Sequence, residues 1–143
     1  ADKKLITEEE ATRGLVRQVA WAFGHISRGM YTSDGKPKNY SQLASIQLHA
    51  LKEAGALIWQ NEGQAANGTD VGCFEVDPAK AKAAVLALET KVLQVKAQGD
   101  KAGAEKLKAA AVDAKDEWAS LRVAITERWL RAPKATFVYA LKP

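Results

Sequence analysis

The sequence has few of the residues from which most catalytic and metal sites are built. It contains one cysteine, Cys73, and two histidines, His25 and His49, in 143 residues. A single cysteine excludes a disulfide within the chain, and beside Phe74 it is typical of a small buried hydrophobic side chain rather than a nucleophile. A zinc site needs three or four ligands in close array, and the two histidines lie in different expected helices. We therefore interpret both histidines as structural.

Long apolar runs and the common nucleotide and hydrolase motifs are also missing. No stretch approaches the roughly 20 apolar residues that cross a bilayer, so we expect no membrane partner. The G-x-S-x-G motif of serine hydrolases does not occur. Gly35-Lys36 resembles part of a phosphate loop, but Met30 stands where the first glycine is needed and Pro37 where a Ser or Thr would bind magnesium. The chain therefore offers no complete catalytic motif.

The charge balance is mildly basic. The 21 basic and 17 acidic residues give a net charge of +4. Nucleic-acid-binding proteins concentrate Lys and Arg on one face, whereas here the basic residues are spread through the expected helices. The densest cluster, Lys36 and Lys38 with Arg28, is small. We expect no nucleic-acid partner.

Helical periodicity dominates what the sequence does contain. Thr7 followed by Glu8–Glu10 predicts a capping box with acidic residues in the first turn, which explains the three glutamates without a metal site. The turn formers at 33–37 should end this helix. Its apolar stripe recurs every three or four residues and comprises Leu15, Val19, Phe23, Ile26 and Met30.

The remaining elements follow from local start and stop signals. A second helix should run from Asn39 or Ser41 to Gly55, and the segments 56–60 and 71–76 predict a hairpin with a long loop. Asp77-Pro78 should start a helix that ends at Gly99 and carries an apolar stripe of Val85, Leu88, Val92 and Val95. Further helices are expected from Asp100 to Val112 and from near Trp118 to Pro133, followed by a strand over 135–141.

The expected fold is mainly α, a single domain over 1–143. It has about five helices, a small β-hairpin and a closing C-terminal strand. The four tryptophans, Trp21, Trp59, Trp118 and Trp129, are most simply core and packing residues. An apolar groove lined by Trp21 or Trp59 would instead indicate a binding site.

Three segments together resemble a known family. They are 23–30 leading into 39–44, then 51–56 with its Glu-Ala-Gly turn, and 93–104 with a glutamine five residues before Gly-Asp. This order is similar to the C-terminal portion of the dipeptidyl peptidase III family of zinc metallopeptidases and its bacterial zinc-dependent hydrolase relatives. The resemblance covers about three quarters of the chain.

The resemblance implies a non-catalytic part of a larger enzyme. The zinc-binding H-E-x-x-G-H helix of the family lies N-terminal to the matched region, so zinc is implied for the parent protein and no cofactor for this chain. The implied partners are the remainder of the parent polypeptide and, in the full enzyme, a peptide substrate. Tyr40, Gln42 and Lys134 are the implied cleft residues. Tyr40 and Ala44 stand where the family has a substrate-binding His and Arg, which is a departure from its pattern.

Two hypotheses therefore remain open. The first is a C-terminal helical domain that forms part of the substrate cleft and supports the metal-bearing part of the enzyme. The second is a free-standing helical binding or interaction domain without enzymatic activity. The compartment, bacterial cytoplasm or periplasm, stays open because one cysteine does not distinguish an oxidising environment from a reducing one.

Overall fold

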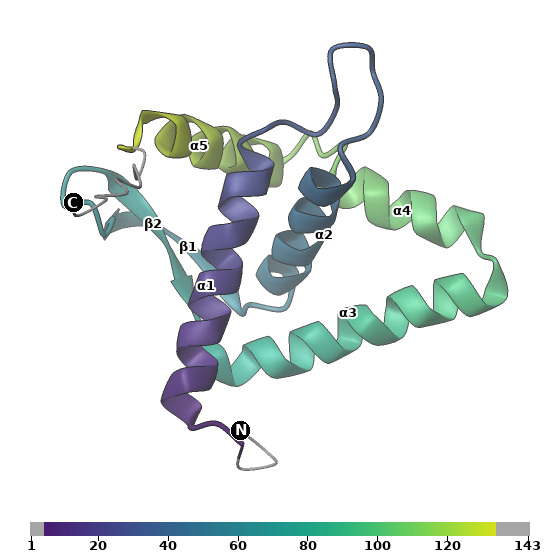
Figure 1. Cartoon of the computed structure of the whole chain (residues 1–143), viewed down its shortest axis with the longest axis horizontal. Coiled ribbons are helices and arrows are strands. Elements are labelled where there is room, and N and C mark those ends of the chain that lie inside the picture. The colour runs from purple at the N-terminus through teal and green to yellow at the C-terminus, as the bar shows by residue number, and fades with distance from the viewer. Residues whose placement is uncertain (1–4, 134–143) are drawn as a thin grey trace, which may run out of the picture.

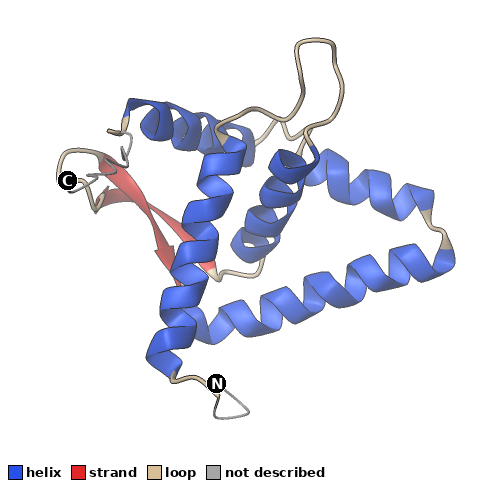
Figure 2. Ribbon diagram, in the orientation of Figure 1, coloured by secondary structure: helices blue, strands red, loops and turns tan. Residues whose placement is uncertain are grey.

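The computed structural model describes residues 5–133, and within them the mainly α fold is confirmed (Figures 1 and 2). The expected strand over 135–141 lies outside the described residues. The elements are, in order, α1 (Glu8–Ile26), α2 (Asn39–Glu53), β1 (Leu57–Gln64), β2 (Val71–Val76), α3 (Pro78–Gln98), α4 (Lys101–Ala111) and α5 (Glu117–Arg131).

The start of α1 is the capping box that the sequence predicts. The Thr7 hydroxyl accepts a hydrogen bond from the Glu10 amide at 3.1 Å, and the Glu10 carboxylate accepts one from the Thr7 amide at 2.7 Å. These bonds hold the pKa of Glu10 below its ordinary value. The glutamates of this turn therefore stabilise the helix start.

The end of α1 differs from the prediction. The helix stops at Ile26, well before the turn formers at 33–37. The Ser27 hydroxyl donates to the Gly24 carbonyl at 2.8 Å, and Gly29 has a φ of +77°, which a helix does not accommodate. Met30 nevertheless packs against the core from the segment that follows.

That segment also contains the small basic cluster noted in the sequence. Lys36 forms an ion pair with Asp34 at 2.8 Å, and the Lys38 ammonium donates to the Arg28 carbonyl. Two of its three basic side chains therefore have partners within their own loop.

The hairpin forms where it is expected but has longer strands. β1 pairs antiparallel with β2 from Leu57 opposite Val76 to Gln60 opposite Cys73, and an irregularity follows before the pair of Gln64 and Val71. β1 thus extends four residues beyond the expected segment, and the loop is correspondingly short.

Two arginines attach the hairpin to α5. The Arg128 guanidinium donates to the carbonyls of Gly72 and Val71, the latter at 2.8 Å, and lies 5.4 Å from the centre of the Trp59 ring. Arg131 bonds the Asp70 carboxylate at 2.6 Å. A two-stranded hairpin is marginal alone, so these contacts to α5 stabilise it.

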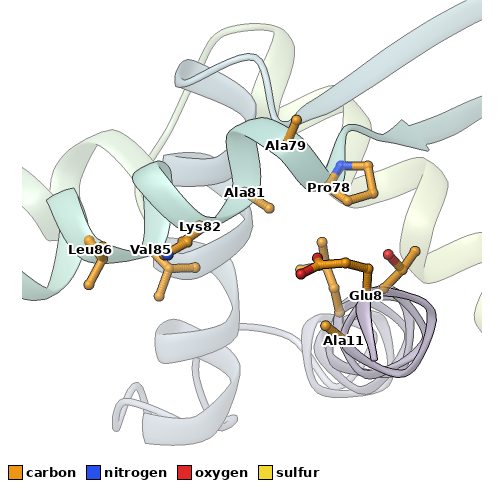
Figure 3. Close-up of a pocket in the computed structure, with 10 residues that line it drawn as sticks. Glu8, Ala11, Pro78, Ala79, Ala81, Lys82, Val85 and Leu86 are labelled. Carbon is orange, nitrogen blue, oxygen red and sulfur yellow. The ribbon is translucent and has the colours of Figure 1, made fainter. Parts of the chain in front are cut away.

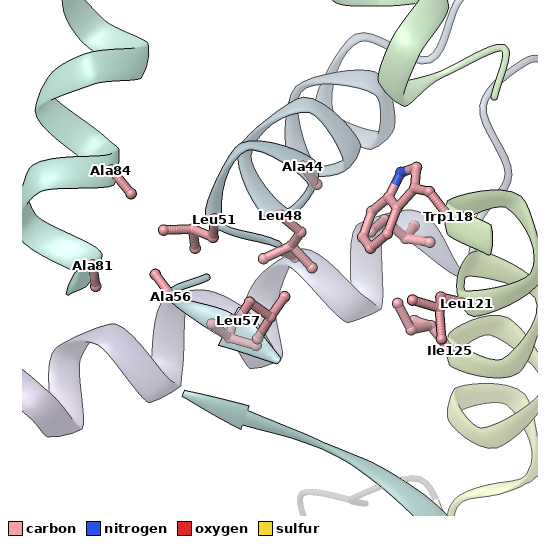
Figure 4. Close-up of a cluster of buried hydrophobic side chains, with 13 residues drawn as sticks. Ala44, Leu48, Leu51, Ala56, Leu57, Ala81, Ala84, Trp118, Leu121 and Ile125 are labelled. Carbon is pink, nitrogen blue, oxygen red and sulfur yellow. The ribbon is translucent and has the colours of Figure 1, made fainter. Parts of the chain in front are cut away.

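The core lies between α1, α2, β1 and α5 (Figure 4). Its largest side chain is Trp118, which is 1% exposed. The indole N–H contacts the Ala111 carbonyl at 3.0 Å and the Ser45 hydroxyl at 3.1 Å, and that hydroxyl donates to the same carbonyl at 2.6 Å. This buried network joins α2, the end of α4 and α5.

The helices α3 and α4 form an arm, which we define as residues 78–111. Figure 1 shows α3 running away from α1 and the hairpin, and α4 returning toward α2. The two start signals are confirmed, because Asp77 and Asp100 cap α3 and α4, and Gly99 ends α3 with a φ of +61°.

The expected apolar stripe of α3 is only partly correct. Val85 and Val92 are exposed, while Leu88 and Val95 are half-buried. The fully buried residues of α3 are both alanines, Ala81 and Ala84. Because α3 diverges from the body of the molecule, by which we mean α1, α2, the hairpin and α5, most of its apolar side chains have no core to enter.

Candidate binding surfaces

A groove separates the first turns of α1 from those of α3. It has a volume of about 550 Å³ and is lined mainly by apolar side chains. Figure 3 shows Glu8 and Ala11 of α1 facing Pro78 and Ala81 of α3 across it. The lining residues are Glu8, Ala11, Thr12, Leu15, Pro78, Ala79, Ala81, Lys82, Val85 and Leu86. A groove of this size suits an apolar side-chain face of a partner.

The groove continues along α3 as a row of exposed apolar residues, which we call the α3 stripe: Val85, Leu86, Val92 and Leu93. Leu86 is 51% exposed and Leu93 is 57% exposed. The two pairs are seven residues apart, so they lie on one side of the helix about 10.5 Å from each other. Val85 and Leu86 also line the groove, which makes the two surfaces continuous.

The arm carries a basic charge that the whole-chain count hides. Residues 78–111 contain seven lysines and three acids, Glu89, Asp100 and Glu105, for a net charge of +4. The rest of the chain, with 14 basic and 14 acidic residues, is neutral. Basic residues occur in all five described helices, but the net excess over acidic residues lies within two consecutive helices, α3 and α4.

A second surface feature is a row of rings across α1 and α2, which we call the aromatic ridge: Trp21, His25 and Tyr40. The ring centres of Trp21 and His25 are 4.2 Å apart, and those of His25 and Tyr40 are 5.6 Å apart. Tyr40 is 67% exposed. The Ser41 hydroxyl donates to the His25 carbonyl at 2.7 Å and ties the two helices together beneath the ridge. Exposed aromatic faces of this kind contact ligands and partners with little loss of entropy.

The three cleft residues implied by the resemblance have different surroundings. Tyr40 lies on the aromatic ridge. Gln42 is half-buried, and its side-chain amide donates to the Met30 carbonyl at 3.1 Å, so that amide holds the segment after α1. Lys134 lies outside the described residues. Tyr40 and Gln42 begin the same helix but are not brought together at one site.

A third surface is a hollow of about 450 Å³ between the hairpin and α5. Trp59 and Trp129 both line it, together with Phe23 and Phe74. The Trp59 and Phe74 ring centres are 4.9 Å apart. An apolar hollow lined by Trp59 is the feature that the sequence analysis associates with a binding domain.

Asp70 supplies the acidic part of this hollow's lining. A hydrogen bond from Asn67, and then the charges of Arg131 and Arg128, hold the pKa of the Asp70 carboxyl below its ordinary value. The hollow therefore combines aromatic walls with a carboxylate that stays ionised and is paired with arginine.

The tryptophans and the remaining rare residues divide between core and surface. Trp118 is buried in the core, and Trp129 packs its ring on Gly24, where α1 and α5 cross closely, so both have core or packing roles. Trp21 and Trp129 are nevertheless exposed at 38% and 45%, so neither belongs to the fully buried core.

His49 and Cys73 do not lie at one site either. His49 is half-buried, with its ring 5.8 Å from that of Trp118 and its Nε2 4.0 Å from Glu53. Cys73 is a free, half-buried thiol in β2. Over residues 5–133, no group of three His, Cys, Asp or Glu side chains is placed to hold a metal ion.

Comparison of the chain with protein-family models, with curated proteins and with solved structures finds no match in any of the three. Within the described part of the chain, no helix has the length and apolar character needed to cross a bilayer.

Sequence reasoning misses the α3 stripe, although one signal was present. The seven-residue repeat of the pairs 85–86 and 92–93 is visible in the sequence.

Proposed function

We propose that this chain is a non-catalytic helical domain of a dipeptidyl peptidase III-like zinc hydrolase, packed through the α1–α3 groove against the metal-bearing part of that enzyme. The observation that supports the proposal is the groove with its continuation, the α3 stripe. Contiguous exposed apolar residues on a helix mark an interaction site, whereas single ones do not. The resemblance supplies the identity of the partner.

The cleft role of the domain centres on the aromatic ridge. In the family's chemistry, zinc polarises the scissile carbonyl and activates a water molecule with a glutamate as general base, and the parent part supplies both groups. This chain contributes a wall. Tyr40 presents an exposed ring to a peptide substrate, and His25 and Ser41 hold it in position. Lys134 stays a further predicted cleft residue.

The test of the zinc hydrolase identity is the complete gene and its product. We expect an H-E-x-x-G-H sequence encoded upstream of Ala1. With the complete enzyme, Tyr40→Ala should raise KM for a peptide substrate about tenfold with little change in kcat, because the ring contacts substrate in the ground state and transition state alike. A gene without H-E-x-x-G-H contradicts the proposal.

A pair of variants on α1 tests whether the chain packs against the metal-bearing part through the α1–α3 groove. Ala11→Arg places a long charged side chain in the α1–α3 groove, opposite Ala81, and it should weaken binding of the chain to the separately produced metal-bearing part. Gly14→Arg, on the same helix with open space around it, should leave binding unchanged. Equal binding by both variants would contradict docking at the groove.

The hollow lined by Trp59 and Trp129 favours a second candidate, a free-standing binding domain for an apolar or aromatic ligand. Trp129→Ala would then reduce ligand-dependent quenching of tryptophan fluorescence, with Trp59 the remaining indole in the hollow, and Trp21→Ala would leave the quenching unchanged. A gene product that begins near Ala1 and binds such a ligand would favour this candidate over the first.

A further inference from the structure

The α3 stripe carries an ordered set of charges as well as apolar side chains. Lys82 precedes the first apolar pair, Glu89 lies between the pairs and Lys96 follows the second. Each of the three lies three or four residues from a pair of the stripe, so they share one side of α3 with it. All three are exposed. The sequence of groups along this face is therefore basic, apolar, acidic, apolar, basic.

We propose that the α3 stripe binds a helix with the inverse pattern: acidic, apolar, basic, apolar, acidic, at the same seven-residue spacing. The partner's apolar pairs would pack on the stripe, and its end nearest α1 would enter the α1–α3 groove. Two helices that match such a repeat form a coiled-coil seam, and the flanking charges determine which partner binds. This inference rests on the proposed function only in assigning the partner helix to the metal-bearing part.

Charge excludes a second copy of this chain as the occupant. Antiparallel pairing that keeps both apolar pairs in contact is centred on Glu89, so it places two Glu89 carboxylates together and Lys82 beside Lys96 of the other copy. Parallel pairing in register places each charge opposite itself. Both arrangements set like charges against each other at all three positions, which is destabilising.

The same acidic residue argues against an anionic surface as the occupant. The arm has a net charge of +4, which attracts anionic partners of every kind. Glu89, however, lies in the middle of the apolar face, where lipid phosphates or a nucleic-acid backbone would meet a carboxylate. A protein helix with a basic residue at that point satisfies it instead.

The probe is a pair of synthetic helical peptides of about three heptads each. Both carry two Leu-Leu pairs at seven-residue spacing with alanine elsewhere. The matched peptide has Lys between the pairs and Glu outside them, and the inverted peptide has Glu between the pairs and Lys outside. We expect the matched peptide to bind the whole chain about tenfold more tightly than the inverted one, by fluorescence anisotropy at low salt.

Variants of the chain separate recognition from folding. The triple variant Lys82→Glu, Glu89→Lys, Lys96→Glu should reverse the preference, so that the inverted peptide binds more tightly. Loss of folding cannot produce such a reversal. Leu86→Asp with Leu93→Asp should abolish binding of both peptides, while Leu130→Asp, an equally exposed leucine on α5, should preserve it.

Three results with the peptides and vesicles would overturn the inference: equal binding of both peptides, a preference that the triple variant does not reverse, or tighter binding to anionic lipid vesicles that Leu86→Asp with Leu93→Asp abolishes. The proposed function fails separately. A gene without H-E-x-x-G-H removes the zinc hydrolase and leaves the peptide preference intact. A metal-bearing part that binds the triple variant as it binds the native chain removes only this inference.

Discussion

The body and the arm of this molecule both contain many apolar residues, but the body buries them and the arm leaves most of them exposed. In the body, α1, α2, β1 and α5 bury leucine, isoleucine and tryptophan around one core. In the arm, α3 is the longest helix among the described residues but fully buries only two alanines, and four of its valines and leucines, Val85, Leu86, Val92 and Leu93, are exposed. Burial stabilises a fold in proportion to area, so the body should hold the stability and the arm the binding surface.

The largest expected effect is at the centre of the body. Trp118→Ala should lower the free energy of unfolding by about 3–5 kcal/mol, because it opens a cavity and removes the indole N–H from Ser45 and Ala111. Urea denaturation measures the change. Trp21→Ala, on the aromatic ridge, should cost less than about 1 kcal/mol. Similar losses for both variants would contradict the placement of the core.

A pair of leucines compares the two regions most directly. Leu48 is 1% exposed in α2, and Leu48→Ala should cost about 2–5 kcal/mol. Leu93→Ala, in the arm, should change stability by less than about 0.5 kcal/mol. Thermal unfolding of the two variants checks this difference. A large loss for Leu93→Ala would mean that the stripe is already packed within the chain.

A pair of glycines tests how closely the helices of the body approach each other. A Cβ at Gly24 would lie 2.8 Å from the Trp129 ring, whereas one at Gly14 would meet nothing within 4 Å. Gly24→Ala should therefore destabilise the fold by about 1–3 kcal/mol. Gly14→Ala should stabilise it by about 0.5–1 kcal/mol, since alanine favours a helix. Chemical denaturation gives both values, and equal signs would contradict the close crossing.

The smallest effect concerns ion pairs in the two regions. Lys52 of α2 bonds Glu117 of α5 at 2.8 Å, and this contact raises the pKa of Lys52 above its ordinary value of 10.5. A raised lysine pKa means stability that is complete below pH 10.5 and lost as the pH rises through the folded-state pKa. Glu117→Gln should cost about 0.5–1 kcal/mol at pH 7, and the difference from the native chain should vanish well above pH 10.5.

The matched control for this pair lies in the arm. Glu105 is 4.0 Å from Lys108, and its side chain is largely exposed. Tyr31 and then Glu105 raise the pKa of Lys108, but solvent screens this exposed pair, so Glu105→Gln should change the pH dependence of unfolding much less than Glu117→Gln does. If Glu105→Gln and Glu117→Gln changed the free energy of unfolding equally at each pH, the greater strength of the partly buried Lys52–Glu117 pair would be contradicted.

Local signals predicted the fold better than they predicted the surface. The capping residues Thr7, Asp77 and Asp100 and the glycines Gly55 and Gly99 act within one turn of the chain, so their roles are readable from sequence. The early end of α1 does have a local breaker, Gly29, but the apolar stripe that continues past it to Met30 favoured a longer helix. The exposure of Trp21 and Trp129 depends on which helices cross, which is a tertiary property.

The candidate site also combines features that local sequence predicts with features that depend on tertiary structure. The resemblance pointed to the start of α2, and Tyr40 does lie exposed there. The resemblance implied the same cleft role for Gln42, yet the side-chain amide of Gln42 donates a hydrogen bond to the Met30 carbonyl. The exposure of the α3 stripe was not predicted, because apolar residues at helical spacing indicate a buried face. The stripe is exposed only because α3 runs away from the body.

Hydrogen–deuterium exchange of the chain, with and without the metal-bearing part that the proposed function assigns as its partner, tests the docking claim most directly. Binding should slow exchange in α3 from residue 82 to 96 and in the first turns of α1, and should leave the loop over 65–70 unchanged. Protection confined to the hairpin and α5, with none on α3, would contradict the claim that the arm is the docking surface.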